Sequence, residues 1–149
     1  MRAAAQGMTA SLVSRDWIAD SVELVARGHL LDGLVTLSGC DKTIPAMVMA
    51  MARLNLPSVM LYGGSIMYGE YRGKRMTVQD IFEAIGARNA GNIDDRELHA
   101  IECASCPGEG ACGGQFTANT MSTAFMMLGV SPMGFNDVPA PDVHKEEIA

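Results

Sequence analysis

The spacing of apolar residues changes several times along the chain, and each change predicts a different element. Near the amino terminus, four apolar residues recur at helical spacing: Trp17, Ile18, Val22 and Val25. Such a stripe is typical of a helix that buries one face. Ser14 is a suitable N-cap and Gly28 a suitable terminator, so the pattern predicts a helix from Ser14 to about Arg27.

Two short apolar runs enclose a longer helical one in the next part of the chain. Residues 33–37 and 57–62 are short and rich in apolar or β-branched residues, which predicts strands. Between them, residues 44–54 read as a helix with Pro45 in its first turn. A strand, helix and strand in this order form a βαβ unit with parallel strands and a right-handed crossover. The predicted fold class is therefore α/β, with parallel-sheet βαβ layers and flanking helices.

The middle of the chain has weaker periodicity. Residues 65–76 hold two glycines and three basic residues without a clear period, and we expect an irregular connection. Thr77 is a good N-cap for a helix over 78–90. Asp94 followed by Glu97 resembles a capping box and predicts a short helix that ends at about residue 101.

The last third begins with a glycine-rich loop over residues 103–114. A helix follows, which opens at Thr117 or Asn119 and continues through Leu128. Beyond it, prolines and glycines break regular structure, and residues 142–147 read as the opening of a further helix.

Composition and charge narrow the function classes. The chain has 149 residues, of which 48% are hydrophobic, and these numbers suit one globular domain with a real core. It has no apolar run long enough to span a membrane and no signal-peptide core at its start, so we expect a cytoplasmic protein without a membrane partner. The net charge of −6 is spread over interspersed residues, which makes a nucleic-acid partner unlikely on electrostatic grounds.

The densest candidate chemistry is the run Cys40-Asp41-Lys42, which lies between the first predicted strand and the next helix. Turns at the carboxyl ends of parallel strands are where open α/β sheets bind ligands. A carboxylate is a hard ligand suited to magnesium, whereas a thiolate is a soft ligand suited to iron-sulfur clusters. The alternative is a solvated cap and ion pair formed by Asp41 and Lys42, which would contribute little.

The other three cysteines, Cys103, Cys106 and Cys112, lie within ten residues of one another in the glycine-rich loop. In a chain without secretion signals, this clustering favours a metal or redox site over disulfides. The spacing C-x2-C-x5-C does not match a standard zinc pattern. With Cys40 included, an iron-sulfur cluster, a four-cysteine zinc site and free thiols all remain open. The three histidines are expected to be exposed and offer no ligand or base.

Five segments give the sequence a family resemblance: residues 11–21 (SLVSRDWIADS), 40–45 (CDKTIP), 61–64 (LYGG), 77–80 (TVQD) and 110–121 (GACGGQFTANTM). In this order they resemble the dihydroxy-acid dehydratase and 6-phosphogluconate dehydratase family. The GACGG form is similar to the dihydroxy-acid dehydratase branch.

This resemblance implies a hydro-lyase that removes water from a 2,3-dihydroxy acid to give a 2-keto acid, as in valine, isoleucine and leucine biosynthesis. It implies that Cys40 and Cys112 bind an iron-sulfur cluster, of the [2Fe-2S] type in this branch. It also implies that Asp41 and a carbamylated Lys42 bind magnesium. The whole protein is expected to be a homodimer that acts on a small dihydroxy acid.

The resemblance covers about a quarter of the family's usual length, and residues 1–149 are expected to be an internal part of the amino-terminal domain. A third cluster cysteine and one magnesium-binding aspartate are expected upstream. A further magnesium ligand, the carboxyl-terminal domain and the serine that acts as base are expected downstream. The chain alone is therefore expected to be inactive, with no catalytic base of its own. The alternatives are a sugar-acid dehydratase of the same family and a noncatalytic zinc module that uses all four cysteines.

Overall fold

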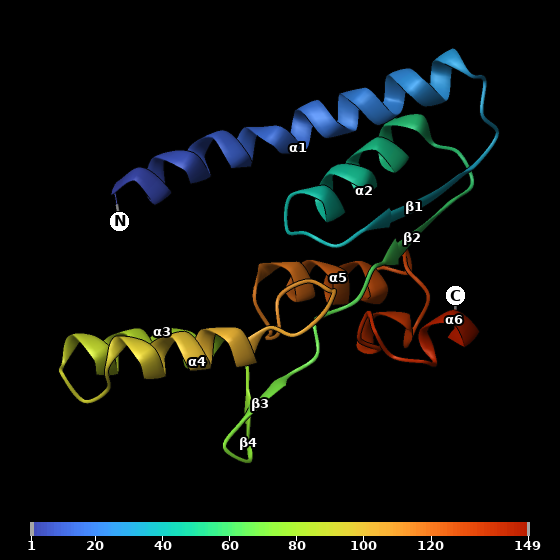
Figure 1. Ribbon diagram of the computed structural model, residues 1–149. Helices are drawn as coiled ribbons and strands as arrows, with labels where there is room; N and C mark the ends of the chain where they lie inside the picture. The colour runs from blue at the N-terminus through green and yellow to red at the C-terminus, as the bar shows by residue number, and fades with distance from the viewer. Residues whose placement is uncertain (1, 149) are drawn as a thin grey trace.

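The computed structural model describes residues 2–148, and the side chains of residues 7–148. Figure 1 shows its main part as stacked layers. Helix α1 (Arg2–Gly28) runs along helix α2 (Thr43–Leu54), and α2 lies on the strands β1 (Leu34–Ser38) and β2 (Ser58–Tyr62). Helix α5 (Thr117–Met127) lies on the other side of these strands (Figure 1).

The predicted βαβ unit is confirmed. Strands β1 and β2 pair in parallel, with Leu34 opposite Ser58 and Ser38 opposite Tyr62, and α2 connects them. Helix α2 follows the turn at Cys40 directly, with Pro45 in its first turn, where a missing N–H costs nothing. The chain is a mixed α/β structure in which helices flank a parallel strand pair.

A small apolar core holds these layers together. Four buried side chains form its centre, and two of them come from α2 and two from β2: Ile44, Met51, Met60 and Tyr62. Alanines make the contact between the two long helices close, because Ala19 and Ala26 of α1 and Ala46 and Ala50 of α2 are all buried. Arg53 of α2 adds an ion pair with Asp20 of α1, at 2.6 Å.

Helix α1 begins much earlier than its sequence pattern predicts. Ser14 is not its N-cap, because the helix begins at Arg2 and the Ser14 hydroxyl donates to the Ser11 carbonyl oxygen at 2.6 Å inside the helix. Residues 2–13 contain several alanines and no proline, so nothing local stops the helix. Its end at Gly28 agrees with the prediction.

The segment expected to be irregular contains a β-hairpin, which corrects that prediction. Strands β3 (Gly69–Tyr71) and β4 (Lys74–Met76) pair antiparallel around Arg72 and Gly73, which both have positive φ angles of 51° and 75°. This is the conformation of a tight two-residue hairpin turn. The strands are three residues long, too short to give a clear alternating pattern.

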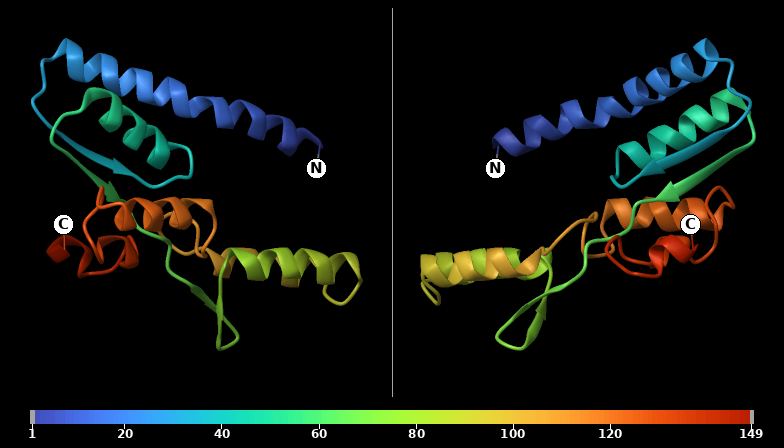
Figure 2. Two further views of the ribbon diagram at one scale, coloured as in Figure 1. Left: turned by 180° about the vertical axis from the view of Figure 1, so that it is seen from behind. Right: turned by 45° about the vertical axis from the view of Figure 1, so that its right-hand side comes forward.

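Helices α3 (Val78–Asn89) and α4 (Asp95–Ser105) lie side by side and extend away from the strand layer, as Figures 1 and 2 show. The predicted caps are confirmed: Thr77 and Asp80 form a capping box, and the Asp94 carboxylate accepts from the Glu97 amide at 2.7 Å. The side chain of Glu97 binds Arg72 of the hairpin instead of completing a second box. Helix α4 continues four residues beyond the predicted end.

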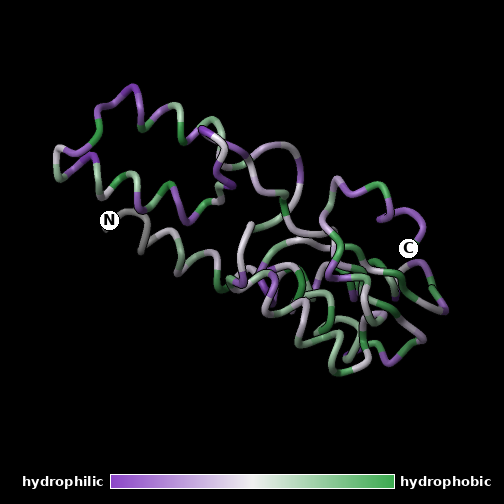
Figure 3. The backbone as a smooth tube through the Cα atoms, turned by 90° about the horizontal axis from the view of Figure 1, so that it is seen from below, coloured by the Kyte–Doolittle hydropathy of each residue, from purple (hydrophilic) through white to green (hydrophobic). Residues whose placement is uncertain are grey.

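Helix α5 begins at Thr117, as one of the two predicted openings, and a 3-10 turn (Phe135–Asp137) and the short helix α6 (Lys145–Ile148) follow it. Figure 3 shows hydrophobic colour gathered where α2, the strands and α5 overlap, and mixed colour along α3 and α4. Across residues 2–148, no helix combines the length and apolar character that crossing a membrane requires.

Candidate functional site

The predicted Cys40-Asp41-Lys42 turn lies at the carboxyl edge of the parallel strand pair. It follows directly after Ser38 and Gly39, and Ser38 is in register with Tyr62, the last residue of β2. The Gly63 amide donates to the Ser38 carbonyl oxygen at 3.0 Å, so the two strand ends stay together one residue beyond the sheet. The thiol and the carboxylate are thus placed where parallel sheets bind ligands.

Short-range hydrogen bonds shape this turn. The Cys40 amide donates to the Thr43 hydroxyl at 3.2 Å, and the Ile44 amide donates to the Cys40 carbonyl at 2.9 Å, which begins α2. Arg15 of α1 donates through Nη2 to the Asp41 carbonyl at 3.2 Å. Arg15 therefore ties the first helix of the chain to the turn.

Within the turn, Asp41 connects the thiol and the amine. The Lys42 ammonium donates to Asp41 Oδ2, and the Cys40 Sγ donates to Asp41 Oδ1 at 3.2 Å. The hydrogen bond from Lys42 lowers the pKa of Asp41, and the bond from Cys40 adds to this, while partial burial opposes both. Asp41 is therefore an anion at neutral pH and an available hard ligand.

The Lys42 side chain is only 8% exposed, although it carries a charge. A solvated cap and ion pair, the alternative interpretation of these two residues, would leave the ammonium in water. A buried ammonium with one carboxylate beside it is unusual and is a feature of functional sites more often than of surfaces. The geometry therefore fits a specialised role for Lys42 better than a surface ion pair.

The second predicted thiol, Cys112, lies in a loop that adds itself to the end of β2. Ala111 forms a parallel bridge with Ser65: its amide donates to the Gly64 carbonyl at 2.9 Å, and its carbonyl accepts from the Ile66 amide at 2.7 Å. Gly110 has a φ of +129°, and a Cβ there would lie 2.4 Å from the Ile66 nitrogen. Only glycine permits this close approach.

The pKa of Tyr62, the last residue of β2, depends on both of these cysteines. Its buried phenol has a pKa raised to about 12, first by burial and then by the negative charges that Cys112 and Cys40 carry when ionised. The two cysteines that add to this shift in the Tyr62 pKa are 72 residues apart in the sequence. The thiols of Cys40 and Cys112 are both exposed.

The remaining cysteines lie elsewhere. Cys103 is on α4, with its Sγ 3.6 Å from His99 Nε2, and Cys106 is the C-cap of that helix. Among the described residues, no group of three or more histidine, cysteine, aspartate or glutamate side chains could hold a metal ion. The four cysteines therefore do not gather into the zinc site that the sequence left open.

The predicted ligands have the chemistry that an iron-sulfur cluster and a magnesium ion require, but each pair is only part of a ligand set. Cys40 and Cys112 each offer an exposed thiol, and iron-sulfur clusters take cysteine thiolates as protein ligands. Asp41 offers an ionised carboxylate beside Lys42, as a magnesium site requires. Each pair would need further ligands from outside the described residues.

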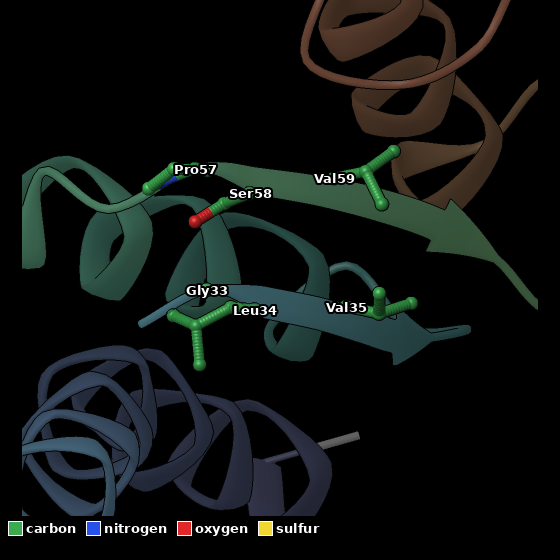
Figure 4. A pocket seen from close by; sticks show the side chains of 6 residues that line it. All are labelled: Gly33, Leu34, Val35, Pro57, Ser58 and Val59. Atoms are coloured by element: carbon green, nitrogen blue, oxygen red, sulfur yellow. The ribbon is translucent and has the colours of Figure 1, made fainter. Parts of the chain in front are cut away.

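A depression on β1 and β2, shown in Figure 4, is not part of this site. Its lining includes Gly33 and Pro57 at the starts of the strands, the end opposite to the Cys40 turn. Ser58 is the only polar side chain that lines it. The side chains of Val35 and Val59 lie farther along the same strands (Figure 4).

Two residues of the site, Tyr62 and Asn119, were not among the predicted candidates. Tyr62 ends a predicted strand, and its hydroxyl donates to Asn119 Oδ1. Asn119 belongs to the same motif as Cys112, and its Nδ2 donates to the Cys112 carbonyl at 2.8 Å. Their positions in the LYGG and GACGGQFTANTM segments were the available signal, but pairing them requires the fold.

The fold and these side chains define a class of protein: an α/β unit with thiol, carboxylate and amine groups at the carboxyl edge of parallel strands. The chain belongs to the family described as Dihydroxy-acid/6-phosphogluconate dehydratase N-terminal, which matches residues 1–149. The resemblance carried by the sequence motifs is confirmed.

Curated relatives agree with this assignment. The chain is 58% identical to a dihydroxy-acid dehydratase of Koribacter versatilis over 144 residues, which are 97% of this chain and 25% of that protein. It is 57% identical to the dihydroxy-acid dehydratase of Parvibaculum lavamentivorans, and 55% identical to that of Thermus thermophilus, with 97% and 94% of this chain covered and 25% of each relative. The chain thus spans about a quarter of the length of these relatives.

Proposed function

We propose that this chain supplies part of the metal-binding site of a hydro-lyase that converts a 2,3-dihydroxy carboxylic acid to a 2-keto acid, as in branched-chain amino-acid biosynthesis. The observation that carries the proposal is that the Cys112 loop is bound through Asn119 to Tyr62, at the strand edge from which the Cys40 turn begins. The ionised Asp41 and the buried Lys42 lie in the same turn as Cys40. The names of the relatives support the reaction class.

In this proposal, Cys40 and Cys112 hold an iron-sulfur cluster of the [2Fe-2S] type, and Asp41 and Lys42 hold magnesium. Lys42 becomes a ligand by carbamylation, in which its neutral amine adds to carbon dioxide, a C–N bond forms and one proton is lost. The product is an anionic oxygen donor in place of a cation. When bound, the two metals supply Lewis acidity to the substrate's carboxylate and hydroxyl groups.

In this proposal, the residues of this chain bind the metals and orient the ligand side chains. The ionised Asp41 and the modified Lys42 provide two negative groups in one turn, which Arg15 holds to α1 through the Asp41 carbonyl. The dehydration removes a proton from C2 and a hydroxide from C3, and the resulting enol tautomerises to the keto acid. We assign no residue of this chain as the base and propose that a serine beyond residue 149 takes the C2 proton.

We also propose that residues 1–149 are one part of a longer amino-terminal domain, and that the whole enzyme is a homodimer. Exposed apolar side chains support the first point, because Val35 and Leu37 of β1 are 72% and 66% exposed. Parallel sheets are normally covered on both faces, so this strand is suited to contact further structure. On its own the 149-residue chain is expected to lack dehydratase activity, and turnover of 2,3-dihydroxyisovalerate by it would contradict this.

Serine substitutions test the cluster assignment. In the whole protein, purified without oxygen, Cys40→Ser and Cys112→Ser should each remove the visible absorption and most of the bound iron and sulfide, because each takes away a thiolate ligand. Cys103→Ser and Cys106→Ser are the matched controls and should leave both unchanged. A Cys112→Ser protein that keeps its cluster and its activity would refute the assignment.

Lys42→Arg tests the carbamate. Arginine keeps the positive charge but does not accept carbon dioxide under these conditions, so magnesium-dependent turnover should be lost. Lys74→Arg, on the β-hairpin, is the control and should retain turnover. Unchanged magnesium dependence in Lys42→Arg would exclude a carbamylated ligand at this position.

The family description names two substrate classes, so a sugar-acid dehydratase is the second candidate. It would use the same metals and the same residues of this chain. Turnover by the whole enzyme should be measured with 2,3-dihydroxyisovalerate and with an aldonic acid. Preference for the aldonic acid would replace the first substrate class with the second.

A further inference from the structure

Asn119, in the first turn of α5, connects the Cys112 loop to Tyr62, which is 57 residues away in the sequence. Its Nδ2 donates to the Cys112 carbonyl at 2.8 Å and also to the Gly114 carbonyl. Its Oδ1 accepts from the Tyr62 hydroxyl at the end of β2. One half-buried amide therefore uses both of its ends to join the Cys112 loop to the strand.

The chemistry of the partners fixes the orientation of this amide. Two backbone carbonyls can only accept hydrogen bonds, so the nitrogen of Asn119 must face them. The amide oxygen then faces Tyr62, and the phenol must be the donor. A donating phenol is a neutral phenol, in agreement with its pKa of about 12, which burial and the two thiols raise.

Hydrogen bonds and short covalent steps together connect the backbone just before Cys40 to the backbone of Cys112. Ser38, two residues before Cys40, accepts from the Gly63 amide at 3.0 Å, and Gly63 follows Tyr62. Tyr62 donates to Asn119, and Asn119 donates to the backbone of Cys112 itself. On the other side of Cys112, Ala111 is bound to the chain beyond β2. The loop is thus attached on both sides of the thiol.

We propose that Asn119 is a positioning residue that sets the place of the Cys112 thiol relative to the Cys40 thiol, through Tyr62. Asn119 touches neither sulfur in this arrangement and acts on Cys112 through its backbone. The consequence for a cluster held by both thiols rests on the proposed function. The hydrogen-bonding role of Asn119 does not depend on it.

Asn119→Asp is the sharpest test, because it keeps the size and the acceptor for Tyr62 but replaces both N–H donors with an oxygen that repels the carbonyls. Asn136, in the 3-10 turn Phe135–Asp137, offers a matched control: its Nδ2 donates to the carbonyl of Ser122 on α5 at 2.9 Å, and its Oδ1 accepts from the Ser131 hydroxyl at 3.2 Å. Asn136→Asp should disturb the fold in a similar way without touching the Cys112 loop.

The first measurement is amide hydrogen exchange in the whole protein. Asn119→Asp should raise exchange in residues 110–116 by about tenfold, as expected for the loss of about one hydrogen bond's worth of stability. Asn136→Asp should leave these residues at the wild-type rate. Unchanged exchange over 110–116 in Asn119→Asp would refute the positioning role, whatever the protein binds. If this variant does not fold, Tyr62→Phe decides, because it must also raise exchange in the loop.

The second measurement is the visible spectrum of oxygen-free protein. Asn119→Asp should lower cluster content or shift the absorption bands, whereas Asn136→Asp should keep the wild-type spectrum. A faster-exchanging loop with an unchanged cluster spectrum would refute the link between Asn119 and the thiol geometry. If the wild-type protein binds no cluster while loop exchange still rises in Asn119→Asp, the proposed function fails and the hydrogen-bonding role of Asn119 stands.

Discussion

The two thiol-bearing segments of the site are built in opposite ways. The turn at Cys40 is held mostly by its neighbours in sequence, since Thr43 and Ile44 bind the Cys40 backbone within four residues. The loop at Cys112 is held by residues from other parts of the chain, Gly64 and Ile66 on one side and Asn119 on the other. Hydrogen bonds between sequence neighbours shape the Cys40 turn, whereas hydrogen bonds to other elements shape the Cys112 loop.

Glycines show the same contrast. A Cβ added at Gly39, before the turn, would meet nothing within 4 Å. A Cβ at Gly110, before Cys112, would lie 2.4 Å from the Ile66 nitrogen, and one at Gly64 would lie 2.5 Å from the Ala140 nitrogen. Gly110 and Gly64 are therefore required by close contact with distant backbone, whereas Gly39 is not. Alanine substitutions at these glycines should therefore lower the free energy of unfolding by different amounts in the turn and in the loop.

The largest effect is expected from Gly110→Ala. The new methyl group would overlap backbone atoms of Ile66, and the φ of +129° is unfavourable for alanine. We expect a loss of about 3 kcal/mol or more in the free energy of unfolding, measured by urea denaturation. Gly39→Ala should change it by about 1 kcal/mol or less, because the site is open and its φ is ordinary.

Equal losses of unfolding free energy in Gly110→Ala and Gly39→Ala would contradict this difference, since the turn would then be as tightly packed as the loop. A small loss in Gly110→Ala alone would mean that the loop can move away from the end of β2. Crystal structures of both variants would show which backbone atoms had shifted.

Asp41→Asn is expected to lower the free energy of unfolding by an intermediate amount that depends on pH. The folded-state pKa of Asp41 lies below its usual value because Lys42 donates to it, so the ionised carboxylate stabilises the fold above the unfolded pKa, about 4. At pH 7, in metal-free protein with Lys42 unmodified, its loss should cost about 1–2 kcal/mol, because the buried Lys42 ammonium keeps no partner carboxylate. The difference from wild type should shrink as the pH falls below about 4, through the folded pKa.

Asp95→Asn is the control for this pH dependence. The pKa of Asp95 is also lowered, by its hydrogen bond to Arg88, but the pair lies at the surface, where solvent screens it. Its substitution should change stability less at every pH. A difference between wild type and Asp41→Asn that grows towards low pH would contradict the assigned direction of the Asp41 pKa shift.

The contrast also explains which features the sequence predicted. The βαβ unit depends on local signals, such as short apolar runs and Pro45 in a first helical turn, and it was predicted with its parallel pairing. The Thr77 capping box is equally local. The placement of Cys40, Asp41 and Lys42 at the carboxyl edge follows from the same unit.

What the sequence did not predict depends on competing or distant contacts. Ser14 looks like an N-cap, but the helix-forming residues before it allow α1 to continue. The turn at Arg72 and Gly73 connects strands too short to show alternation. The partnership of Tyr62 with Asn119 spans 57 residues, and no periodicity or spacing indicates it. The metal roles of the four predicted ligands stay a prediction that rests on the family resemblance.

The smallest effect is expected from Thr43→Val, which removes the hydroxyl that binds both the Cys40 amide and carbonyl at 3.2 Å. The loss in the free energy of unfolding should be about 0.5–1 kcal/mol, because both hydrogen bonds are exposed and water can replace them. Thr43→Ser, the control, keeps the hydroxyl and should lose less. Because these bonds are local, hydrogen exchange should rise at residues 40–46 and stay unchanged at 110–116. Faster exchange in both segments would show that the turn and the loop open as one unit. The turn would then not be held independently by hydrogen bonds to its sequence neighbours.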